Sequence, residues 1–96
     1  MEIYIFGKFH VREGMEGEAE KALREVVKAS REEAGCVEIH AYRGIKDGRV
    51  YYIHSTWKDA AAFELHAALP HTLRFLERIT ELSDQERDVK RTERIV

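Results

Sequence analysis

The chain has 96 residues, of which 44% are hydrophobic and 35% are charged, with 16 Lys and Arg against 18 Asp and Glu. This length predicts one domain, residues 1–96, with a thin core, because so short a chain buries only about 60–65% of its unfolded surface. The net charge of −2 argues against a nucleic-acid partner, which would need a basic face. A single cysteine excludes an intramolecular disulfide, and no signal-like or membrane-spanning apolar run occurs. We therefore expect a cytoplasmic protein without a membrane partner.

The first predicted elements are a strand and a helix. Ile3–Arg12 alternates, with apolar residues on both sides, so this strand is expected to be covered on both faces. In Met15–Ala34 the apolar residues recur at spacings of three and four, which predicts an amphipathic helix. Gly35 follows, and we expect it to end the helix in the left-handed conformation.

Two further strands are predicted over Cys36–Ile45 and Arg49–Trp57, joined by a tight Asp-Gly turn. Such a turn determines which residues pair across the hairpin. It places His40 on the same face as Trp57 and His54 on the opposite face. Neither face of the hairpin is wholly polar, so both faces are expected to be covered.

The second half of the chain predicts helical segments and a last strand. Asp59 is the expected N-cap of a short helix, and Pro70 suits the first turn of another. Arg87–Val96 is interpreted as a strand in preference to a frayed terminus, because its Val, Thr and Ile are not interrupted by Gly or Pro. The order predicts an α+β fold, a ferredoxin-like βαββαβ sandwich whose antiparallel four-stranded sheet has helices on one face.

Histidines near the second helical region are the best candidates for chemistry. His66 and His71 are the predicted catalytic residues, because an imidazole with a pKa near 6.5 can take a proton from a phenol near neutral pH. The alternative is that both are structural. Their spacing differs from the helical i, i+4 pair of a zinc site, so no metal is predicted.

Around these histidines we predict an apolar pocket that binds a substrate. Its expected substrate-binding residues are Trp57, Tyr51, Ile53, His40, Phe63 and Phe75. For Trp57 the alternative role is that of a packing anchor. The sequence has no Gly-rich phosphate loop, nucleophile elbow or CxxC pair, so we predict no cofactor.

Several segments resemble the antibiotic biosynthesis monooxygenase family, small dimeric α/β-barrel proteins that include quinol monooxygenases. The matching segments are residues 9–14, residues 34–37, Trp57, residues 62–66 and residues 69–71. The resemblance implies a homodimer in which two sheets pack face to face. It also implies a cofactor-independent monooxygenase that oxidises a small aromatic, quinol or polyketide-type substrate with O2. The alternatives are a non-enzymatic dimeric module that binds a small ligand and an oxygen-independent isomerase on the same scaffold.

The chain departs from this family at informative positions. Members commonly have a glutamate two residues before the tryptophan, where this chain has Ser55. Haem-degrading relatives use an asparagine on the first strand, a tryptophan on the second helix and a histidine further along that helix. The corresponding positions here hold Gly7 or Lys8, His66 and Leu76, so haem degradation is disfavoured.

Overall fold

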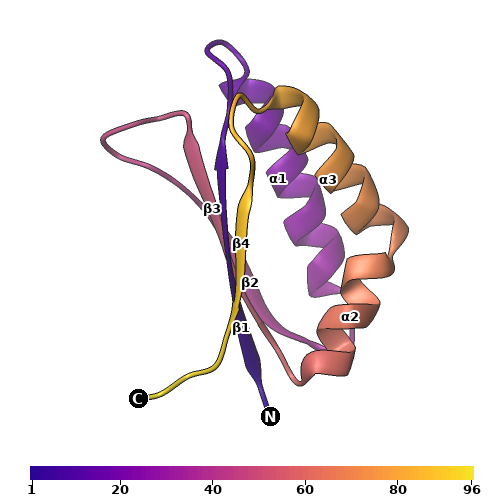
Figure 1. Ribbon diagram of the computed structural model, residues 1–96. Coiled ribbons are helices and arrows are strands. Elements are labelled where there is room, and N and C mark those ends of the chain that lie inside the picture. Colours follow the sequence, from indigo (N-terminus) through magenta and orange to yellow (C-terminus); the bar gives the residue numbers. More distant parts are fainter.

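The computed structural model describes residues 1–96 and confirms the predicted α+β fold. Its elements are β1 (Ile3–His10), α1 (Glu16–Arg31), β2 (Cys36–Arg43), β3 (Val50–Trp57), α2 (Ala60–Ala68), α3 (Pro70–Leu82) and β4 (Asp88–Thr92). The strands form one antiparallel sheet in the order β2-β3-β1-β4 (Figure 1). Two helices, α2 and α3, follow β3, as the sequence predicts.

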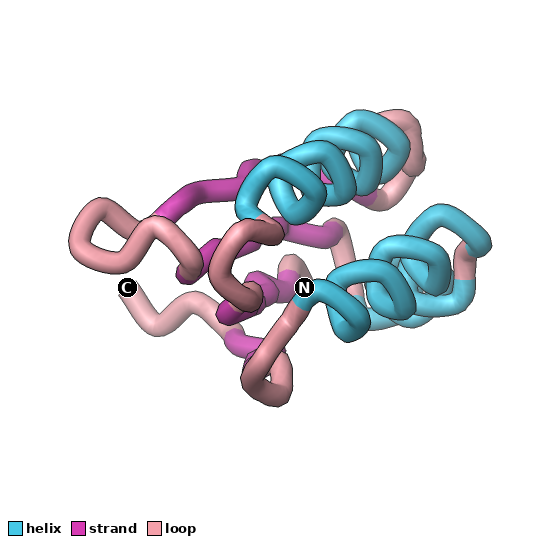
Figure 2. Tube along the Cα trace, turned by 90° about the horizontal axis from the view of Figure 1, so that it is seen from above, coloured by secondary structure: helices cyan, strands magenta, loops and turns pink.

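All three helices lie on one face of the sheet and leave the other face open (Figures 1 and 2). The core forms where α1 and α3 pack on the covered face. In β1, Ile5 and Phe9 point toward the helices and Phe6 points away, as the alternation predicts. The Phe9 ring meets the Phe75 ring of α3 edge to face, with 5.6 Å between centroids. None of the helices is long and apolar enough to cross a membrane.

The prediction that Gly35 ends α1 in the left-handed conformation is wrong. The helix ends at Arg31, and the only positive φ angle in the chain belongs to Gly14, at 88°. Gly35 is needed for a steric reason, since a Cβ atom there would lie 2.4 Å from the Cβ of Ala62 in α2. The absence of a side chain at this position lets the start of β2 approach α2 closely.

We expect Gly35→Ala to lower the free energy of unfolding by about 1–3 kcal/mol, because the added methyl group displaces α2 from the sheet. Urea denaturation followed by circular dichroism measures the loss. In a chain that already carries Ala62→Gly the opposing methyl group is gone, so the same substitution should cost less. An equal cost in both backgrounds would contradict the steric explanation.

The β2-β3 hairpin also differs from the prediction. Arg43 pairs with Tyr51, and the turn is longer than two residues: Gly44 N–H donates to Val50 O, and Val50 N–H donates to Asp47 O. The prediction of a tight Asp-Gly turn is therefore wrong. A change of register by one residue moves every side chain of a strand to the other face.

As a consequence, His40 does not share the face of Trp57. It pairs with His54, and both lie on the open side of the sheet. Ile39 and Ala41 instead occupy the covered face of β2, opposite Ser55 and Ile53.

The predicted starts of both helices in the second half are confirmed. The Asp59 carboxylate caps α2 by accepting from Ala62 N–H at 2.8 Å, and Pro70 is the first residue of α3. The last strand is shorter than predicted. It covers Asp88–Thr92 and pairs with β1, while the residues beyond it extend away from the sheet.

His10, the last residue of β1, forms hydrogen bonds with residues of two different loops. His10 Nδ1 lies 2.5 Å from Asp84 Oδ1, and its Nε2 lies 3.2 Å from Asp47 Oδ2. The Asp84 hydrogen bond is the main cause that raises the pKa of His10, and the same contact lowers the pKa of Asp84. Through its contacts with Asp47 and Asp84, His10 joins the β2-β3 turn to the connection between α3 and β4.

Candidate functional site

The break between α2 and α3 brings His66 and His71 together. On an unbroken helix, residues five apart are rotated by about 140° and would point in different directions. Leu69 interrupts the helix with an extended ψ of 148°, and Pro70 starts α3 in a new direction. The two imidazole rings consequently lie with 6.0 Å between their centroids.

Glu33 lies between the two histidines. It belongs to the turn after α1, which is held by hydrogen bonds from Glu33 N–H to Ser30 O and from Cys36 N–H to Glu33 O. One oxygen, Oε2, lies 2.8 Å from His66 Nδ1 and 2.8 Å from His71 Nε2. Because an ionised carboxylate only accepts hydrogen bonds, this geometry requires a proton on each of these two nitrogens.

The other side of His66 is covered by aromatic rings. Trp57 is the last residue of β3 and has no exposed surface. Its indole ring lies against the imidazole of His66, with 4.3 Å between centroids and 32° between planes, and Phe63 contacts both. The indole N–H donates to Ser55 Oγ at 3.0 Å. We call Glu33, Trp57, Phe63, His66 and His71 the histidine cluster.

Burial controls the charge of His66, whose side chain is only 10% exposed. It lowers the pKa of His66 below the usual 6.5, and the hydrogen bond to Glu33 opposes this only in part. His66 is therefore neutral at pH 7. Since Nδ1 carries the proton that Glu33 accepts, the lone pair is on Nε2, which makes this atom a proton acceptor held in a defined orientation.

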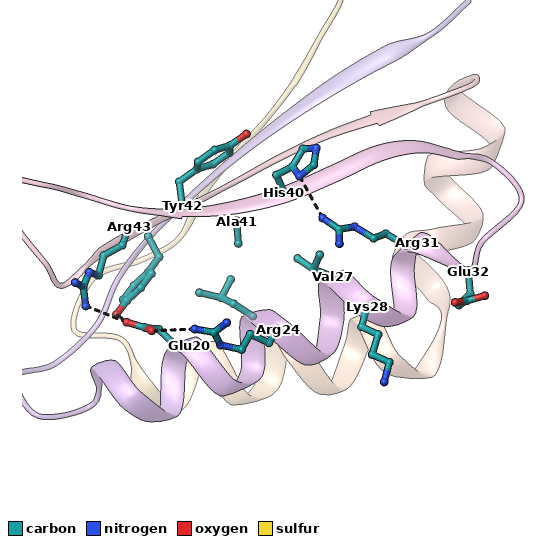
Figure 3. Close-up of a pocket in the computed structure, with 12 residues that line it drawn as sticks. Glu20, Arg24, Val27, Lys28, Arg31, Glu32, His40, Ala41, Tyr42 and Arg43 are labelled. Carbon is teal, nitrogen blue, oxygen red and sulfur yellow. Dashed lines mark hydrogen bonds and ion pairs between the residues drawn. The ribbon is translucent and has the colours of Figure 1, made fainter.

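A second feature is a groove between α1 and β2, with a volume of about 810 Å³ (Figure 3). Its lining includes the basic residues Arg24, Lys28, Arg31 and Arg43. Arg43 and Arg24 both pair with Glu20, and the Arg31 guanidinium lies 3.1 Å from His40 Nδ1. The Tyr51 hydroxyl also donates to Glu20, at 2.9 Å, and burial raises the pKa of Tyr51.

The predicted substrate-binding residues divide between these two places. Tyr51 lines the groove, and His40 lies only at its edge, where Arg31 reaches past β2 to the open side of the sheet. Trp57 and Phe63 belong to the histidine cluster. Tyr51 and Trp57 are six residues apart on β3, roughly 20 Å along the strand, so one small molecule cannot stack on both. The prediction of one pocket formed by all of them is therefore wrong.

The sequence pattern described as antibiotic biosynthesis monooxygenase matches residues 2–78 of the chain. The chain belongs to this family.

Solved structures share the fold of this antibiotic biosynthesis monooxygenase domain over at least 95% of its length. A Mycobacterium tuberculosis protein is 18% identical, with a TM-score of 0.94 over 100% of this chain and 97% of that one. A Pseudomonas aeruginosa protein is 28% identical, with a TM-score of 0.89 over 99% and 95%. A Bacteroides thetaiotaomicron protein described as a possible oxidoreductase is 23% identical, with a TM-score of 0.89 over 95% of each chain. No curated protein matches the chain significantly.

Within this monooxygenase-family domain, the structure brings His66, His71, Trp57 and Phe63 together and places the other predicted residues elsewhere. Phe75 lies one turn after His71 but packs in the core against Phe9. Ile53 packs at the margin of the same core.

Sequence reasoning missed Glu33, the residue that connects the two histidines. It is one of two adjacent glutamates in the turn after α1, and no local pattern distinguishes it from Glu32. The role of Ser55 was also missed. Its hydroxyl accepts from the indole of Trp57, and the carboxylate beside the histidines comes from a different element, the turn after α1.

Proposed function

We propose that this chain is a cofactor-independent monooxygenase that oxidises a small aromatic, quinol or polyketide-type substrate with O2. The observation that carries the proposal is the geometry around His66, whose imidazole is oriented by Glu33 and held against Trp57. Burial lowers the pKa of this imidazole, which favours its neutral form. Membership of the antibiotic biosynthesis monooxygenase family supports the reaction type.

Each residue of the histidine cluster has a role in this reaction. Nε2 of His66 accepts the proton of a phenolic hydroxyl, and Glu33 is a positioning residue that stabilises the resulting imidazolium. His71 donates to the same carboxylate and holds it in place. Phe63, which is half-buried, supplies the apolar surface against which an aromatic ring would stack, and the fully buried Trp57 packs against Phe63.

The substrate itself supplies the electrons. A phenolate whose fused ring system contains a CH2 group is electron-rich enough to react with O2. The CH2 carbon becomes a carbonyl and loses two hydrogens, one oxygen atom enters the substrate, and the other leaves as water. The protein has to bind, deprotonate and exclude water, which needs no further redox group.

Oxygen uptake by metal-stripped protein tests this function, with a panel of hydroquinones and polycyclic phenols that include ring CH2 groups. We expect uptake for at least one aromatic class, with one oxygen atom of each O2 found in the product, the other released as water, and no hydrogen peroxide. Absence of uptake above the rate without protein, across the panel, would overturn the proposal.

A second candidate is a non-enzymatic module that binds a small ligand, and one observation favours it. Trp57 has no exposed surface and His66 is 8% exposed, so in this conformation a substrate reaches neither ring face. Quenching of the fluorescence of Trp57, the only tryptophan, by a phenol without oxygen uptake would favour this candidate. Turnover that continues without oxygen would instead indicate the isomerase.

We also propose that the chain works as a homodimer formed through the open face of the sheet. Phe6 of β1 is 51% exposed, Tyr52 of β3 is 42% exposed and Tyr42 of β2 is 51% exposed. Tyr42 and Tyr52 are paired across the hairpin, and Phe6 stacks on His54 with 4.9 Å between ring centroids. These residues form an apolar patch on a face that no helix of the same chain covers.

Sedimentation equilibrium at micromolar concentration should give about twice the 11.2 kDa mass of one chain. The double variant Phe6→Glu/Tyr52→Glu should be a monomer, because it buries two carboxylates without partners in the interface. Leu73→Glu, on the outer side of α3, is the matched control and should remain dimeric. A wild-type mass of one chain would contradict the homodimer.

A further inference from the structure

The histidine cluster contains a set of donor atoms that its proposed catalytic role does not fully explain. His66 Nδ1, His71 Nε2 and a carboxylate oxygen of Glu33 all lie within 4.8 Å of one another. They come from three separate elements, the end of α2, the first turn of α3 and the turn after α1. Three donors from three elements converge on one point.

Glu33 has no lysine or arginine as a counterion. The only ion-pair partners of Glu33 are the two histidines, and no lysine or arginine contacts it. Its side chain is 13% exposed. The carboxylate is therefore largely removed from water and has only imidazole groups as partners, a place where a cation would add a compensating charge.

We propose that Glu33, His66 and His71 bind one divalent first-row transition-metal ion, such as Zn2+. Two imidazole nitrogens and one carboxylate oxygen are the donor set that such ions take, with a further position left for water.

The spacing of the donors suits this ion. In a tetrahedral site with bonds near 2.0–2.1 Å, the donors are about 3.3 Å apart. Here Glu33 Oε2 lies 2.8 Å from each nitrogen, so small side-chain rotations would admit the ion. Thr72 Oγ1, 3.3 Å from His66 Nδ1, and the ring of Trp57 limit how far His66 can move.

Metal binding is separate from the proposed oxygenase chemistry. A metal on Nδ1 of His66 would require the proton on Nε2, so the loaded protein would lack the base described above. Binding can be measured without any substrate, and its failure would leave the proposed function untouched.

The test is calorimetric titration of the untagged wild-type chain with Zn2+, repeated with Co2+ followed by visible absorption. We expect saturation at one ion per chain with micromolar or tighter affinity. Glu33→Gln and His71→Ala should each weaken binding about 100-fold or more, because each removes a ligand rather than a supporting contact. His40→Ala removes a histidine from the open face and should bind like wild type.

Two results would overturn the proposal. One is the absence of saturable binding by the folded wild-type chain at micromolar concentration. The other is binding that survives at full strength in both the Glu33→Gln and the His71→Ala variants, which would place the ion elsewhere. Circular dichroism of each variant confirms that it is folded, and the two substitutions act on different elements, so unfolding of one leaves the other as the test.

Discussion

Replacing His66 with alanine is expected to lower the kcat of oxygen uptake by about 10²–10⁴-fold, the contribution of a positioned general base. In the wild type, kcat/KM should fall as the pH drops through an apparent pKa below 6.5, because only neutral His66 accepts a proton and burial lowers its pKa. The pH profile of oxygen uptake measures both effects.

Glu33→Gln separates positioning from proton transfer. Its carboxylate raises the pKa of His66, so the amide should move the acid limb of the profile to still lower pH as well as reducing kcat. His40→Ala is the matched histidine control and should keep both parameters. Unchanged turnover in folded His66→Ala protein would rule out His66 as the base.

Trp57→Ala is expected to reduce the free energy of unfolding by about 3–5 kcal/mol, because the indole is fully buried against His66 and Phe63. A domain of this size has roughly 5–15 kcal/mol in total, so the loss is a large share. Urea denaturation has to be followed by circular dichroism, since the substitution removes the only tryptophan.

Graded variants define the cause of this loss. Trp57→Phe keeps an aromatic ring and should be less destabilising than alanine. Ser55→Ala leaves the buried indole N–H without its acceptor and should cost about 1–3 kcal/mol. Leu65→Ala, exposed on α2, should change stability by no more than about 0.5 kcal/mol. A loss for Trp57→Ala as small as that of Leu65→Ala would contradict the packing role.

The predictions that succeeded depend on interactions between near neighbours in the sequence. Asp59 as a cap and Pro70 at the start of a helix follow from the backbone groups within one turn. The alternation in β1 follows from the pleat of a strand. Once these elements and their order are known, few arrangements of helices and strands remain, so the α+β fold followed from them.

The predictions that failed depend on contacts between distant segments. The Asp-Gly pair suggested a tight turn, but the register follows the packing of Ile39 and Tyr51 in the core, and this moved His40 to the open face. Gly35 looked like a helix terminator, whereas its real constraint is the methyl group of Ala62, which the sequence gives no reason to expect nearby.

The sequence alone determined the fold, the family resemblance and the choice of His66 and His71 as the candidate catalytic residues. Only the tertiary structure decided that Glu33 joins them, that Trp57 is buried against His66, and that Tyr51 and His40 lie elsewhere. The physical reason is that helices and strands are stabilised by neighbours along the chain. A site needs atoms within about 3 Å of each other, and Glu33 and His66 are 33 positions apart in the chain.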